Sequence, residues 1–233
     1  MSNADSPTNR RGFIATVAGG TAALAATLTA GELFAQARSF PDYPAPQGGW
    51  DLAWVDRVEK AKHKMVFDQP EVTDGLAENN ALTYLRGYAD VYKTTDADMA
   101  VVIVVRHGAM SVVLNDNMWD KMKLGEKGKM KDPTTGETSS RNPFINIKAD
   151  DKHASVLREG ALDALMARGV IVLACNLALM RNAGILAKEA NMPVEEARTL
   201  IAASLVPGVI RQPSGIFAVA RAQEAGCHFI RAT

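Results

Sequence analysis

Cysteine and aromatic residues are scarce in this chain of 233 residues. The two cysteines, Cys175 and Cys227, are too few for the disulfide framework of a small secreted domain. Aromatic residues make up 6% of the chain, and we expect its tryptophans and tyrosines in the core rather than on a binding platform. The formal net charge is zero, which argues against a nucleic-acid partner and against attraction to an anionic membrane surface.

Sequence patterns that hold metals or phosphates are also absent. The four histidines and two cysteines include no pair at His-x3-His or Cys-x2-Cys spacing. The chain has no glycine-rich phosphate loop, and Pro213-Ser214-Gly215 lacks the Gly-x-Ser-x-Gly frame of a serine nucleophile. We therefore expect no metal centre and no bound cofactor.

A long uncharged run lies close to the N-terminus. Arg10 and Arg11 precede the run Phe13–Ala30, and Ala35-Gln36-Ala37 forms a small-x-small cleavage site. Thirteen residues of the run are Ala, Gly or Thr, which are too weakly apolar for a good anchor. We predict a cleaved twin-arginine signal peptide over residues 1–37 and a periplasmic mature chain with no stable membrane anchor. An uncleaved N-terminal anchor is the alternative.

Strand and helix patterns alternate along the rest of the chain. The β-branched runs Met99–Val105 and Val170–Ala174 are typical of strands buried on both faces. We expect shorter strands at Lys64–Asp68, Val209–Arg211 and His228–Arg231. The predicted helices are Asn79–Tyr92, Leu114–Met122, Ser155–Arg168, Leu177–Asn191, Val194–Ser204 and Ser214–Ala225.

This alternation predicts an α/β domain over residues 63–233, with a mostly parallel sheet of about five strands and helices on both faces. An irregular arm, residues 38–62, precedes it. The polar, lysine-rich segment 124–143 is predicted to be a loop, either a solvated surface or a lid that attracts anions.

Cys175 ends a predicted buried strand and directly precedes a helix. A helix N-terminus stabilises a thiolate, and the thiolate is the nucleophilic form of cysteine. The alternative is an inert, buried thiol. Cys227 opens the last strand at the opposite edge of the sheet, about 16 Å away. A disulfide between the two is therefore not expected, and we interpret Cys227 as structural.

Arg106-His107-Gly108 follows the strand Met99–Val105 and resembles the signature of the histidine phosphatases. In that family the histidine accepts the phosphoryl group and the arginine binds phosphate. Here Ala109-Met110 come next, where that family has Glu or Gln, and the signature follows the second strand instead of the first. His107 is otherwise expected to line the same cleft as Cys175, or to be a satisfied histidine at the sheet edge.

The second half of the chain resembles the DsrE/DsrF-like family, which includes the TusD-type sulfur-relay subunits. The resemblance rests on the segments Gly169–Gly184, Leu205–Val209, Pro213–Gly215 and Ala222–Ile230, and by order of elements it extends from His63 to Thr233. It implies a flavodoxin-like three-layer fold, assembly as a trimer or hexamer, and a persulfide sulfur accepted by Cys175. The export signal and the arm depart from the family pattern.

Three hypotheses of function follow. The first is a periplasmic sulfur carrier or sulfurtransferase-like protein that uses Cys175 and exchanges sulfur with a donor or acceptor protein. The second is a non-catalytic oligomeric module that binds a small ligand or metal near Arg106, His107 and Asn176. The third is a phosphohydrolase that uses Arg106 and His107.

Overall fold

The computed structural model describes residues 43–152 and 158–233, so the expected signal peptide, residues 1–37, lies outside the described residues. The described residues form one sheet with the order β4-β3-β2-β1-β5, in which every neighbouring pair is parallel. The strands are β1 (His63–Gln69), β2 (Met99–Val105), β3 (Ile171–Cys175), β4 (Ile210–Gln212) and β5 (His228–Arg231). The predicted fold class, α/β with a parallel sheet of about five strands, is confirmed.

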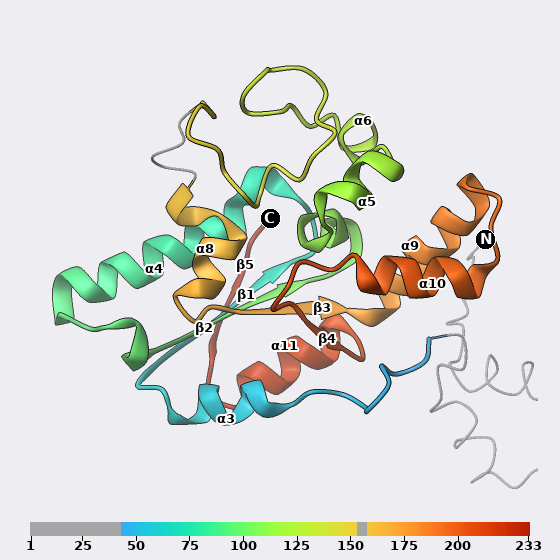
Figure 1. Ribbon diagram of the computed structural model, residues 1–233. Coiled ribbons are helices and arrows are strands. Elements are labelled where there is room, and N and C mark those ends of the chain that lie inside the picture. Colours follow the sequence, from blue (N-terminus) through green and yellow to red (C-terminus); the bar gives the residue numbers. More distant parts are fainter. Residues whose placement is uncertain (1–42, 153–157) are drawn as a thin grey trace, which may run out of the picture. The chain divides into compact units, whose positions relative to one another are not determined.

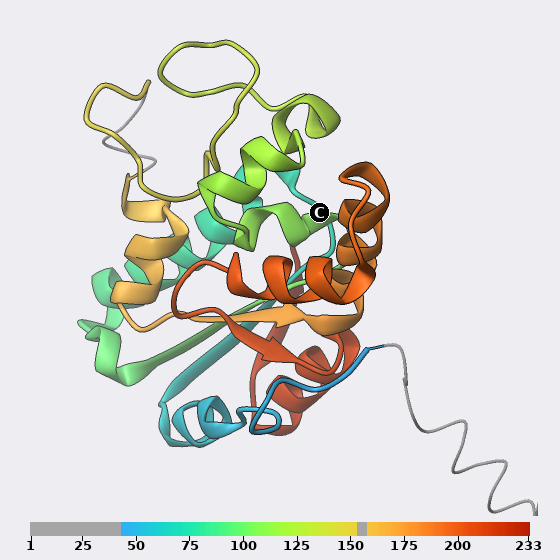
Figure 2. The ribbon, with the colours of Figure 1, turned by 45° about the vertical axis from the view of Figure 1, so that its right-hand side comes forward.

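Helices cover both faces of this sheet, which makes a three-layer α/β fold of the flavodoxin-like kind (Figure 1). One face carries α4 (Leu76–Tyr92), α8 (Leu162–Ala167) and α9 (Asn176–Glu189), and α10 (Val194–Ala203) packs on α9. The opposite face carries α3 (Ala53–Lys60) and α11 (Gly215–Glu224). The turned view shows the same layering (Figure 2). Within the described ranges, no helix is long and apolar enough to cross a membrane.

The core between the sheet and the α3–α11 face is built by strand alternation. Successive side chains of a strand point to opposite faces, so every second residue enters the same layer. This layer combines alternate strand residues with side chains of α3 and α11: Val66, Val102, Val104, Ile171, Leu173, Trp54, Val55, Val58, Ala218 and Ala222. The compact unit begins at Ala45, so α3 belongs to it although it was expected in the arm, residues 38–62.

The observed elements begin and end close to their predicted limits. Strands β2 and β5 match the predicted ranges, and Ser214 caps α11 by accepting a hydrogen bond from the backbone N–H of Phe217 at 3.0 Å. Helix α4 begins at Leu76 instead of Asn79, because Gly75 takes a left-handed conformation as its N-cap. The predicted helix 155–168 falls partly outside the described residues, and its described end is α8.

The segment predicted as a loop, residues 124–143, contains a short helix at its start and follows another. Helix α5 (Asp116–Lys121) precedes it and α6 (Leu124–Gly128) opens it. Arg141 then binds two carboxylates, Asp132 through Nε at 2.6 Å and Asp151 through Nη2 at 2.5 Å. The segment is thus held by partly buried ion pairs, while its lysines at 127, 129 and 131 are exposed, which favours the solvated-surface interpretation.

The connections that follow β3 and β4 lead to opposite faces of the sheet. The segments after β1, β2 and β3 lead to helices on the α4–α9 face, whereas the segment after β4 leads to α11 on the other face. Strands β3 and β4 are neighbours, and their last residues, Cys175 and Gln212, are paired in register. In open α/β sheets, ligands bind at such a switch point, outside the carboxyl ends of the strands.

Candidate functional site

Cys175 lies at this switch point, as the last residue of β3 and the N-cap of α9. Its Sγ accepts a hydrogen bond from the backbone N–H of Ala178 at 3.5 Å, so the sulfur sits on the first turn of the helix. The residue is 6% exposed. Unpaired N–H groups and the partial positive charge of a helix N-terminus favour a negative charge at this position.

Arg106 lies beside Cys175 on the neighbouring strand, one position beyond the last registered pair, Val105 and Ala174. Its guanidinium donates two hydrogen bonds to Asp68 at the end of β1, from Nε at 2.6 Å and from Nη2 at 2.7 Å. The hydrogen bond to Asp68 raises the pKa of Arg106, and the negative charge of an ionised Cys175 raises it further.

Gly215 makes room for Arg106. A Cβ at position 215 would lie 2.6 Å from both Cβ and Cδ of Arg106, closer than side-chain atoms approach in proteins. Gly215 is the first residue of α11 and follows the N-cap Ser214. The N-terminus of α11 therefore lies beside Arg106. The motif Pro213-Ser214-Gly215 therefore begins a helix and leaves space for the aliphatic part of the Arg106 side chain.

Asn176 is held by a second arginine. The Nη2 of Arg211, on β4, donates to Oδ1 of Asn176 at 2.5 Å. Burial lowers the pKa of Arg211, and its buried Nε has no hydrogen-bond partner in the part of the chain that the structure describes. An arginine keeps its proton in proteins, so Arg211 adds a positive charge next to the Cys175–Asn176 turn. Asp68 balances the charge of Arg106, whereas no described carboxylate pairs with Arg211.

His107 is exposed and begins a 3-10 helix, η3 (His107–Val113), with a φ of 48°. Its side chain makes no hydrogen bond or ion pair with the described residues. The structure thus brings Arg106, Asn176 and Cys175 together at the switch point and places the His107 imidazole in solvent. The alternative interpretation, a histidine with satisfied hydrogen bonds at the sheet edge, has no support among the described residues, since none of them bonds to the imidazole.

Cys227 lies directly before β5, at the amino end of that strand. It is 7% exposed and belongs to the core between the sheet and helices α3 and α11. Burial raises the pKa of its thiol to about 11. Both cysteines are free thiols, as the strand order predicts. Across residues 43–152 and 158–233, no group of three His, Cys, Asp or Glu side chains is placed to hold a metal ion.

Sequence reasoning missed three residues of this site: Asp68, Arg211 and Gly215. Asp68 had a signal, because it directly follows the apolar residues Met65, Val66 and Phe67 near the carboxyl end of the strand, and a carboxylate buried there requires a cationic partner. Gly215 also had one, since glycine is a poor residue for a first helical turn unless something packs against it. Arg211 had none, because the contact to Asn176 depends on the pairing of β3 with β4.

Comparison with known proteins adds little to this geometry. No protein-family model matches the chain, and no curated protein matches it. Among solved structures, the chain is similar to a protein of unknown function, MTH1491, from Methanobacterium thermoautotrophicum. The identity is 15%, the match covers 72% of this chain and 98% of that chain, and the TM-score is 0.38. This likeness carries no argument about function.

Proposed function

We propose that the protein is an exported sulfur carrier of the DsrE/DsrF-like kind, which holds a persulfide on Cys175. One observation carries the proposal: the Sγ of Cys175 sits on the first turn of a 14-residue helix, at the end of a strand whose neighbour β2 leads into Arg106. Reactive cysteines occupy electropositive positions because the thiolate is the attacking species, and a helix N-terminus provides such a position.

The proposed step needs no redox partner beyond the sulfur donor. The thiolate of Cys175 attacks the outer sulfur of a persulfide, R–S–SH, and a new S–S bond forms at Sγ. The S–S bond of the donor breaks, and the donor leaves as a thiolate that keeps the bonding electron pair. Cys175 then carries S–SH, and the reverse attack by an acceptor thiolate returns the protein to its starting state.

The charges at the switch point suit both the thiolate and the persulfide anion. Two helix N-termini, those of α9 and α11, meet there. Arg211 contributes a positive charge that no described carboxylate balances, whereas the charge of Arg106 is paired with Asp68. At 6% exposure, Cys175 suits a slender donor such as a persulfide or polysulfide end better than a bulky electrophile.

The geometry supports the phosphohydrolase hypothesis less well. Phosphate binding would use the guanidinium of Arg106, yet two of its donors are bound to Asp68. A phosphoryl acceptor histidine would need an orienting partner, and the exposed His107 has none among the described residues.

Intact mass spectrometry after treatment with sodium polysulfide tests the proposal. We expect the wild-type protein and Cys227→Ser, the matched control, to gain the mass of one sulfur atom that dithiothreitol removes. We expect Cys175→Ser to gain none. Equal sulfur uptake by Cys175→Ser and the wild type, or no uptake by the wild type, would contradict a carrier role for Cys175.

The proposal includes assembly as a homo-oligomer, a trimer or hexamer, in the periplasm. Exposed apolar side chains next to the site and on the edge strand β5 support such an assembly: Ile216, Phe217, Phe229 and Ile230. Light scattering that gives a monomer mass would exclude the oligomer. Replacing Arg10 and Arg11 by lysine should retain the protein in the cytoplasm, and unchanged export would refute the twin-arginine route.

A further inference from the structure

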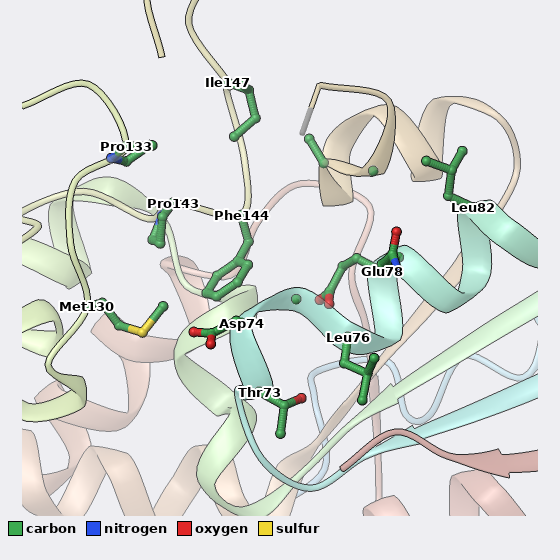
Figure 3. Close-up of a pocket in the computed structure, with 14 residues that line it drawn as sticks. Thr73, Asp74, Leu76, Glu78, Leu82, Met130, Pro133, Pro143, Phe144 and Ile147 are labelled. Atoms are coloured by element: carbon green, nitrogen blue, oxygen red, sulfur yellow. The ribbon is translucent and has the colours of Figure 1, made fainter. Parts of the chain in front are cut away.

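A second concave site lies on the α4 face of the molecule, between the start of α4 and the segments around residues 130–147 and 160–161. It is a cavity of about 500 Å³, which lies within the size range of small-molecule sites in proteins (Figure 3). Most of its lining is apolar, with Leu76, Leu82, Met130, Phe144 and Ile147 among the side chains. Such a cavity accommodates the apolar body of an organic ligand.

The described ionisable residues that line this cavity are all acidic. They are Glu78 on α4 and Asp74 in the turn before it, and no Lys, Arg or His is among the lining residues that the structure describes. Glu78 is 3% exposed, and both of its carboxylate oxygens accept from Nε2 of Gln69 at 3.1 Å. Gln69 is neutral, and no ion pair involves Glu78 within the described ranges. A carboxylate has about four lone-pair positions, so Glu78 can accept further donors from a ligand.

The turn that forms one wall of the cavity is strained. Thr73 and Asp74 have φ of 42° and 49°, a left-handed conformation that residues other than glycine rarely adopt, and Gly75 follows with 79°. The buried hydroxyl of Thr73 has no hydrogen-bond partner in the described structure. This conformation places the turn against the Phe144 ring, which a Cβ on Gly75 would approach to 3.5 Å. Backbone strain of this kind is concentrated at ligand-binding positions.

We propose that this cavity binds a small organic cation, with its apolar body among Leu82, Met130 and Phe144 and its ammonium group on the carboxylate of Glu78. The ammonium group donates to the carboxylate and removes the cost of a buried, uncompensated charge. Asp74 at the wall adds a second negative charge that favours a cation over an anion. Cys175 does not line this cavity, so the site is independent of the sulfur-carrier proposal.

Titration calorimetry with phenethylamine and its neutral isostere phenethyl alcohol tests the site. Because the ammonium group forms an ion pair with the carboxylate that the neutral hydroxyl cannot form, the amine should bind the full-length protein at least about tenfold more tightly than the alcohol. Glu78→Gln should abolish this preference by weakening the binding of the amine. Glu71→Gln, an exposed carboxylate outside the cavity, is the matched control and should keep the preference.

A second measurement makes the test independent of any variant. With methionine methyl groups labelled with carbon-13, the amine should shift the Met130 resonance and leave that of Met99, on β2, unchanged. Binding of amine and alcohol with equal affinity, no binding of either, or an amine preference that survives in Glu78→Gln would overturn the proposal. So would saturating amine that leaves Met130 unshifted.

Discussion

Replacing Glu78 by glutamine gives a sharp test of how burial controls the charge of this carboxyl group. Glu78 is 3% exposed, and burial raises its pKa from 4.5 to about 7. The folded-state pKa is higher than the unfolded-state pKa, so the folded protein binds this proton more tightly. The contribution of Glu78 to the free energy of unfolding is therefore highest below pH 4.5 and is lost as the pH rises through about 7.

The size of this loss follows from the pKa change. One pKa unit corresponds to about 1.4 kcal/mol, so the ionised Glu78 should cost the folded protein about 3 kcal/mol relative to its protonated form. Glutamine has nearly the same shape and no charge. Glu78→Gln should match the wild type at about pH 4 and exceed its free energy of unfolding by up to about 3 kcal/mol at about pH 8.

Urea unfolding followed by tryptophan fluorescence measures both proteins, since Trp54 and Trp119 are buried and report loss of the core. Glu71→Gln controls for removal of an exposed carboxylate and should show no such trend with pH. A difference between Glu78→Gln and wild type that stays constant from about pH 5 to about pH 8 would refute the reasoning. A variant that loses stability relative to the wild type as the pH rises would do the same.

Three further predictions concern the switch point and the second cysteine. Gly215→Ala should lower the free energy of unfolding by about 1–3 kcal/mol, because the added Cβ overlaps Arg106. Gly184→Ala in α9, where a Cβ meets nothing within 4 Å, is the control and should raise the free energy of unfolding by up to about 1 kcal/mol. Equal effects of the two substitutions in urea unfolding would exclude this packing argument. Iodoacetamide at neutral pH should leave Cys227 unmodified in the folded protein, because burial raises its pKa to about 11 and little thiolate forms; rapid labelling detected by peptide mapping would contradict this. A non-reducing digest should contain no peptide pair joining Cys175 to Cys227, and detection of one would contradict the strand order.

Much of the fold was predictable because its signals are local. The uninterrupted apolar run Met99–Val105 matches β2 residue for residue, since a strand buried on both faces needs apolar side chains at every position. The helix limits at Ser214 and next to Gly169 were predictable because a capping hydroxyl and a left-handed glycine act on their own neighbouring backbone. The position of Cys175 between a strand and a helix was visible for the same reason.

The remainder of the site depends on strand order and register, which bring distant segments together. Asp68 and Arg106 are 38 positions apart and meet because β1 and β2 are parallel neighbours. Arg211 reaches Asn176 only because β4 pairs with β3. The local sequence therefore determined the helices, the strands and the cysteine at a helix start. Tertiary structure decided which charges surround that cysteine, because ion pairs depend on distance in space and not on distance along the chain.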